Sequence, residues 1–188
     1  MSRALPALVV SVIFAVAISS RGSWAQSCLE PDPVVLYTAV FLDAPSRVAL
    51  LEAYPPIHEV VYVDHMTMIY QPCAAALNDS KVTPWGLQVI LSVYGNQSDS
   101  KGQAVVVTPS PQVYSQNNFT HVTISCAHGV GAVYSNELLQ DDGYVPAEEP
   151  FLLLSGKVGA ILYGSSSQPV FQNPEDHDFD SGSRLDSF

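Results

Sequence analysis

Positive charge is scarce in this chain of 188 residues. The sequence holds 7 Lys and Arg residues against 18 Asp and Glu residues, which gives a formal net charge of −11 at pH 7. Affinity for long nucleic acids comes largely from cationic contacts to phosphate, so this balance argues against a protein that binds duplex DNA or RNA. A nucleic-acid ligand is therefore expected to be a strand end or a short fragment, and a small nucleotide is also compatible.

Cysteine is rare as well, because the chain holds only Cys28, Cys73 and Cys126. Their spacing does not match the ligand patterns of zinc sites, and no metal site is predicted. In an oxidising compartment, three cysteines suggest one disulfide and one spare thiol. Cys126 falls on the apolar face of a predicted strand, where a buried thiol is common, so we expect Cys28 to pair with Cys73.

Long apolar runs are confined to the N-terminus. Residues 1–25 combine a basic start at Arg3, an apolar stretch over residues 5–20 and small residues around Trp24, which is the pattern of a secretory signal peptide cleaved after Ala25. An uncleaved membrane anchor is the alternative, but the run is short for a bilayer span and serines interrupt it. We therefore expect a secreted or lumenal protein that has no membrane attachment after cleavage.

The rest of the chain divides into one domain and a tail. Residues 26–164 are enough for a single domain with its own core. Residues 165–188 change to Ser, Gln, Asn and Asp with little apolar content, so we predict a disordered acidic tail there. Glycosylation sequons at Asn78, Asn96 and Asn118 agree with a secretory route.

One segment of the domain has clear helix signals. Asp43 is a capping residue, and Pro45 follows it at an early helical position, so a helix is predicted up to Tyr54. Its inward stripe is expected to consist of Val48, Leu51 and Tyr54. A second, short helix is predicted at residues 133–139.

Runs of β-branched and aromatic residues predict strands over much of the remaining domain. The predicted strands are residues 34–42, 60–70, 86–94, 103–108, 120–127, 151–154 and 158–163. The last two are expected to form a hairpin that turns near Lys157, and residues 71–84 are expected to be a polar loop.

Two of the predicted strands contain the same pattern of a histidine, an apolar residue and a threonine. One is His65-Met66-Thr67 and the other is His121-Val122-Thr123. Alternate side chains of a strand share a face, so each histidine is expected to point the same way as its threonine. Ser125 falls on the same face as His121, whereas Asp64 is expected to point away from His65.

An imidazole beside a hydroxyl, presented twice, suits phosphate ester chemistry. Two imidazoles can divide the work of general base and general acid, and hydroxyls can donate hydrogen bonds to phosphate oxygens. The candidate catalytic residues are therefore His65 and His121, and candidate substrate-binding residues are Thr67, Thr123 and Ser125. Lys157 is a further candidate to approach phosphate, although a solvated turn lysine is the commoner explanation. The residues alone do not say which histidine is the acid.

These motifs and their flanks resemble the two-histidine phosphoesterase superfamily, and within it the cyclic phosphodiesterase group related to tRNA ligases. The similar stretches are residues 37–42, 64–68, 121–125, 133–139 and 154–159. The resemblance implies an α+β fold of two pseudo-symmetric lobes, each a small antiparallel sheet with a helix, in which the two His-x-Thr strands line a central cleft. A weak internal repeat around the histidines agrees with two lobes.

The resemblance also implies an activity, namely the hydrolysis of 2′,3′-cyclic phosphates on RNA ends or nucleotides. The expected product is a phosphomonoester, typically the 2′-phosphate, and no metal or other cofactor is expected. The resemblance assigns His65 and His121 as the catalytic pair and Thr67 and Thr123 as phosphate ligands. We expect the enzyme to be a monomer.

Two other functions compete with this one. A secreted protein of the same fold that binds a nucleotide or phosphate without turnover is the alternative, although a pure binder has no evident need for two proton-transfer groups. A metal-dependent hydrolase with the histidines as ligands ranks last, because no Asp or Glu is expected on the face that carries His65.

Overall fold

The computed structural model describes residues 28, 30–141, 143–147, 152–164 and 168–174. The predicted signal peptide, residues 1–25, lies outside the described residues. No helix in the described part of the chain is both long and apolar enough to span a bilayer.

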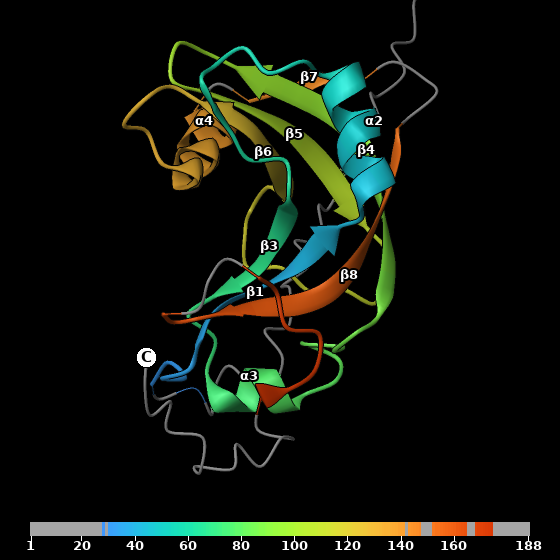
Figure 1. Ribbon diagram of the computed structural model, residues 1–188, viewed down its shortest axis with the longest axis vertical. Coiled ribbons are helices and arrows are strands. Elements are labelled where there is room, and N and C mark those ends of the chain that lie inside the picture. Colours follow the sequence, from blue (N-terminus) through green and yellow to red (C-terminus); the bar gives the residue numbers. More distant parts are fainter. Residues whose placement is uncertain (1–27, 29, 142, 148–151, 165–167, 175–188) are drawn as a thin grey trace, which may run out of the picture.

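Antiparallel strands close into a six-stranded β-barrel (Figure 1). The six are β1 (Val35–Leu42), β3 (His65–Tyr70), β4 (Gln88–Ser98), β5 (Gly102–Pro109), β6 (His121–Cys126) and β8 (Leu153–Leu162). Each strand pairs with two of the others, in the cyclic order β1-β3-β6-β5-β4-β8 and back to β1. Two short strands, β2 (Val60–Val61) and β7 (Val145–Pro146), extend β6 and β4.

The predicted α+β fold with two pseudo-symmetric lobes is therefore wrong. The described chain is mainly β, and its strands form one closed barrel in place of two sheets that each carry a helix. The resemblance between the two histidine strands favoured two lobes, yet these strands are direct neighbours, because Met66 of β3 pairs with Val122 of β6. Sequence patterns identify strands well, but they do not specify which strands pair.

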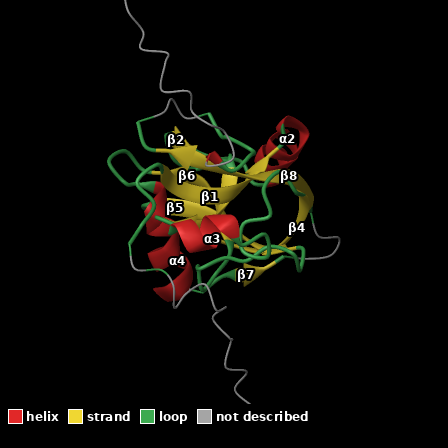
Figure 2. Ribbon diagram, turned by 90° about the horizontal axis from the view of Figure 1, so that it is seen from below, coloured by secondary structure: helices red, strands yellow, loops and turns green. Residues whose placement is uncertain are grey.

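The described residues also contain three α-helices. Figure 2 shows α2 and α4 at the sides of the sheet. They are α2 (Ala44–Ala53), α3 (Ala74–Asn78) and α4 (Ser135–Asp141), and a 3-10 turn, η1 (Ala132–Tyr134), precedes α4. The helix expected at residues 133–139 is thus present with shifted ends. Residues 71–84 are not wholly a loop, since they contain α3.

Helix α2 begins as the sequence predicts. The Asp43 carboxylate accepts a hydrogen bond of 2.9 Å from the backbone N–H of Ser46, as an N-cap should. The inward face is only partly the expected one, because Leu50 is fully buried whereas Val48 is 55% exposed. Leu51 and Tyr54 pack partly against the core, as predicted.

The barrel interior is filled by alternate side chains of its strands. Met66 and Met68 of β3 and Val122 and Ile124 of β6 are fully buried in this core. This confirms the predicted alternation in both histidine strands. His65, Thr67, His121 and Thr123 therefore project from the outer face of the barrel.

Strand β8 is continuous from Leu153 to Leu162, so the hairpin expected to turn near Lys157 is wrong. Lys157 lies within the strand and pairs with Phe41 of β1. The Gly156 that suggested a turn instead allows close approach, because a Cβ there would lie 2.7 Å from the carbonyl oxygen of Phe41.

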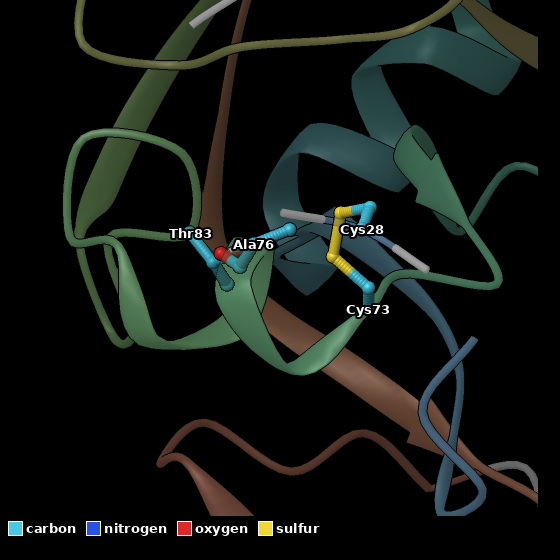
Figure 3. Close-up of a disulfide and its surroundings, with 4 residues drawn as sticks. All are labelled: Cys28, Cys73, Ala76 and Thr83. Atoms are coloured by element: carbon cyan, nitrogen blue, oxygen red, sulfur yellow. Dashed lines mark hydrogen bonds between the residues drawn. A yellow bond between two sulfur atoms is a disulfide. The ribbon is translucent and has the colours of Figure 1, made fainter. Parts of the chain in front are cut away.

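The expected disulfide between Cys28 and Cys73 is present, with the two Cα atoms 5.5 Å apart (Figure 3). It ties the N-terminal segment to the start of α3. The loop after α3 is held by a hydrogen bond of 2.9 Å that the Thr83 hydroxyl donates to the carbonyl of Ala76. Cys126 is a buried free thiol, as predicted.

Part of the segment predicted as a tail lies against the barrel. Val170 forms a β-bridge with Ala160 of β8, and Asn173 is only 5% exposed. The Asn173 side chain donates a hydrogen bond of 2.7 Å to Asn78 at the end of α3. The rest of the predicted tail, residues 165–167 and 175–188, lies outside the described residues.

Candidate active site

The two His-x-Thr motifs meet on neighbouring strands. Met66 and Val122 form a matched antiparallel pair, so both motifs lie on directly adjacent strands and their histidines and threonines project from the outer face. The two rings are close enough for the charge of His65 to lower the pKa of His121. The structure thus brings the predicted pair of motifs together.

The His65 ring is held on both sides. Its Nδ1 lies 2.8 Å from Oδ1 of Asp64. The ring of Tyr37 stacks on it with centroids 5.0 Å apart, and Phe41 lies 5.7 Å away at a tilt. With Nδ1 turned to the carboxylate, Nε2 is the nitrogen left for a ligand, and the side chain is 19% exposed.

Asp64 corrects an expectation, because its carboxylate contacts the ring from which it was predicted to point away. Strand alternation does not extend back to Asp64, since β3 begins at His65 and Val63 has a left-handed backbone with φ 50°. Burial raises the pKa of Asp64, but the hydrogen bond and charge of His65 outweigh this effect, so the pKa is lowered. The carboxylate is therefore ionised at neutral pH.

His121 is the more buried of the two histidines, with 7% of its surface exposed. Its Nδ1 lies 2.8 Å from the carbonyl oxygen of Phe119. A carbonyl only accepts, so Nδ1 carries the hydrogen and Nε2 of the neutral ring is an open base. Burial lowers the pKa of His121, the bond to Phe119 opposes this effect, and the charge of nearby His65 lowers the pKa further.

The two threonine hydroxyls have different surroundings. Thr67 is half-buried, and no hydrogen bond of its hydroxyl occurs within the described residues. The Thr123 hydroxyl lies 2.9 Å from that of Ser135 and donates to the carbonyl of Ala132 at 3.3 Å. Since Ser135 begins α4, the η1–α4 segment positions the Thr123 hydroxyl.

The two secondary candidates lie apart from this group. Ser125 is fully buried, and its hydroxyl donates a hydrogen bond of 2.8 Å to Gln103. In the pairing of β5 with β6, Gln103 lies opposite Ser125 and the next residue, Ala104, lies opposite Thr123, so the register shifts there. Neighbouring residues of a strand point to opposite faces, so this shift places Ser125 and Thr123 on different faces. Lys157 is exposed on β8, on the far side of β1 from His65, and its Nζ lies 5.1 Å from the ring centroid of Phe171.

A cavity of about 740 Å³ opens next to His65. Its lining includes Tyr37, Phe41 and Asp64, which all contact the His65 ring. Arg47, Lys157 and Phe171 also line it.

Asp64, Tyr37 and Ser135 were not identified as site residues from the sequence. Asp64 carried a weak signal, because it directly precedes the histidine. Tyr37 and Ser135 carried none, since their contacts arise only from the pairing of β1 with β3 and from the packing of α4 on the barrel. Among the described residues, no group of three or more His, Cys, Asp or Glu residues is arranged to hold a metal ion.

Comparison with protein-family models found no match, and comparison with curated protein sequences found none either. Among solved structures, the chain is similar to a fungal RNA kinase, with a TM-score of 0.42 and 14% sequence identity. The similarity covers 76% of this chain and 44% of that one, so the chain spans less than half the length of the kinase. Membership of the two-histidine phosphoesterases remains a prediction from the motifs.

Proposed function

We propose that this protein is a metal-independent cyclic phosphodiesterase that opens 2′,3′-cyclic phosphates on RNA ends or nucleotides and leaves a 2′-phosphate. One observation carries the proposal. Two histidines on neighbouring strands each have Nδ1 engaged and Nε2 available, and each motif places its threonine on the same outer face. The proposal rests on these side chains and draws nothing from the similarity to the RNA kinase.

The surroundings of the two rings favour a division of roles. His121 is held neutral by burial, so its Nε2 is suited to remove a proton from the attacking water. His65 lies against an ionised carboxylate that compensates the charge of a protonated ring, so it is suited to donate a proton.

With these two roles, each proton that moves in the hydrolysis has a donor and an acceptor. The water oxygen bonds to phosphorus as its proton passes to Nε2 of His121. The bond between phosphorus and the ribose 3′ oxygen breaks, and that oxygen takes the proton from Nε2 of His65. The 2′-phosphate remains, and one proton exchange with solvent restores the two rings.

The threonines are assigned to the phosphate group. Thr67 and Thr123 project from the same face as the histidines, where the Thr67 hydroxyl can donate a hydrogen bond to a non-bridging oxygen as charge develops. The Thr123 hydroxyl already donates its single hydrogen to the carbonyl of Ala132, so it can donate to phosphate only by giving up that bond. The contact with Ser135 fixes the orientation of the Thr123 hydroxyl. Ser125 was a predicted substrate ligand, but its buried bond to Gln103 favours a role in supporting β6.

We also propose that the protein acts as a monomer in a secretory compartment or outside the cell. The Cys28–Cys73 disulfide supports an oxidising environment. The net charge of −11 supports short RNA ends or free nucleotides as substrates, in preference to duplexes.

The test is hydrolysis of 2′,3′-cyclic nucleotides and of cyclic-phosphate-ended oligonucleotides in EDTA. His65→Ala and His121→Ala are expected to lower kcat by about 10²- to 10⁴-fold each, the usual value of one general acid or base. His128→Ala, which changes an exposed histidine outside the motifs, is the matched control. Phosphorus NMR of the product shows which ester bond breaks.

Each outcome of this test has a clear meaning. Activity that survives both motif substitutions would reject the site, and activity that is lost in EDTA would reject metal independence. Folded protein that binds nucleotides without turnover would favour the alternative function of a nucleotide-binding protein.

A further inference from the structure

Two of the chain's few cations line the cavity beside His65. Of the 7 Lys and Arg residues, Arg3, Arg21 and Arg184 lie outside the described residues, which leaves four. Arg47 in the first turn of α2 and Lys157 in the middle of β8 both line this cavity, and both side chains are exposed. Half of the described cations therefore line one site.

The acidic groups of the same cavity are already engaged. The Asp43 carboxylate caps α2 through Ser46, and the Asp64 carboxylate holds Nδ1 of His65. Neither Arg47 nor Lys157 comes within ion-pair distance of a described acidic residue, although the charge of Arg47 helps to lower the pKa of Asp64. The Lys157 ammonium lies over the Phe171 ring, and both side chains are exposed, so an anion from solution can reach them.

Lys157, which lines the cavity, lies at a defined distance from His65, the proposed acid. Phe41 pairs with His65 on one side and with Lys157 on the other, so the three residues form one row across β3, β1 and β8. Neighbouring strands lie about 4.8 Å apart, so Lys157 and His65 are separated by roughly 10 Å along the sheet. A ligand that reaches from one to the other is longer than a single phosphate group.

The remaining lining suits a nucleotide. Phe171 stands edge-on to Phe41, with ring centroids 6.1 Å apart, and Tyr37 stacks toward Phe41 at 6.4 Å. Phe41 is buried, whereas Tyr37 and Phe171 are partly exposed. Aromatic rings that reach the surface are places where bases or sugars pack without regard to sequence. A cavity of about 740 Å³ has room for one nucleotide unit and not for a long strand.

We propose that this cavity is a subsite for the nucleotide preceding the cyclic-phosphate end, with Arg47 and Lys157 holding the phosphodiester on the 5′ side of the terminal nucleotide. The inference rests on the proposed function and narrows its substrate from any cyclic nucleotide to an RNA end. It also assigns Lys157 to the phosphodiester between the two nucleotides and not to the cyclic phosphate that reacts.

The test measures binding of reaction products, which needs no turnover. Calorimetry compares uridine 2′-phosphate with the dinucleotide UpU that carries a 2′-phosphate at its end. The wild type is expected to bind the dinucleotide at least roughly tenfold more tightly, the value of one charge-assisted contact. Arg47→Gln and Lys157→Gln should remove most of this advantage and leave the affinity for uridine 2′-phosphate unchanged.

Lys81→Gln, at an exposed cation away from the cavity, is the matched control and should change neither affinity. Equal affinity of the wild type for both products would overturn the subsite, as would variants that weaken both products alike. Hydrolysis of the two cyclic substrates is measured in parallel. A protein that keeps the dinucleotide preference but hydrolyses neither substrate would support the subsite and reject the proposed activity.

Discussion

The Asp64 carboxylate holds the His65 ring through a 2.8 Å contact between Oδ1 and Nδ1. The two residues are adjacent in the chain, and β3 begins only at His65, after a left-handed backbone at Val63. The contact fixes which ring nitrogen remains for the substrate. It makes Asp64 a positioning residue for the proposed acid.

Asp64→Asn should reduce turnover without preventing folding. Asparagine still accepts the hydrogen bond from Nδ1 but no longer compensates the charge of a protonated ring, so kcat is expected to fall about 10- to 100-fold, as for other groups that orient a working histidine. Steady-state kinetics provide the measurement. The loss should appear in kcat with little change in KM, a split that a purely structural role would not cause.

Glu59→Gln serves as the control for that substitution, because it removes an exposed acid a few residues away. If Asp64→Asn matches the wild type in kcat, the contact has no catalytic role.

The buried His121 should make stability depend on pH. Its pKa is lowered from the ordinary value of 6.5, so between the two pKa values the unfolded chain binds more protons than the folded one. Stability should therefore be complete above pH 6.5 and fall as the pH drops through the lowered pKa. Urea unfolding of wild type and His121→Gln at several pH values measures this, and the variant should lose less stability on acidification.

If the two proteins lose stability in parallel as the pH falls, His121 is not the group responsible. His58→Gln is a useful comparison, since that ring is also partly buried and lies outside both motifs.

The Cys28–Cys73 disulfide should contribute substantially to stability. It joins residues separated by 45 positions, for which loop-closure entropy gives about 4 kcal/mol. The double variant Cys28→Ser, Cys73→Ser should be destabilised by roughly that free energy of unfolding. Denaturant melts with and without reductant test this, because reductant should destabilise the wild type and leave the double variant unchanged. If reductant leaves the free energy of unfolding of the wild type unchanged, the expectation is contradicted.

Gly159→Ala should displace residues 168–174 from the barrel. A Cβ at this position would lie 2.8 Å from the Phe171 ring and would also press on the carbonyl of Val170. Such overpacking costs about 1–3 kcal/mol, so we expect lower stability and faster proteolysis of this segment. Gly131→Ala is the control, because its added Cβ meets only an ordinary contact at 3.9 Å. Equal proteolysis of the two variants would show that the segment does not depend on Gly159.

Local patterns in the sequence were sufficient for several features. The alternation of apolar residues in the histidine strands, the cap at Asp43 and the pairing of Cys28 with Cys73 were all predicted and are confirmed. Each depends on backbone geometry within a few residues or on a simple choice among three cysteines. The position of Lys157 was not predictable in this way, because a glycine that signals a turn can equally allow two strands to approach closely.

The sequence by itself determined the approximate places of most strands, which faces of the histidine strands are apolar, and that each histidine shares a face with a threonine. Only the tertiary structure decided that the strands close into one barrel, that β3 and β6 are neighbours, and that Arg47 and Lys157 line one cavity. The reason is physical. The direction of a side chain follows from the local backbone, whereas the choice of strand partners depends on how the whole chain buries its apolar faces and satisfies its hydrogen bonds.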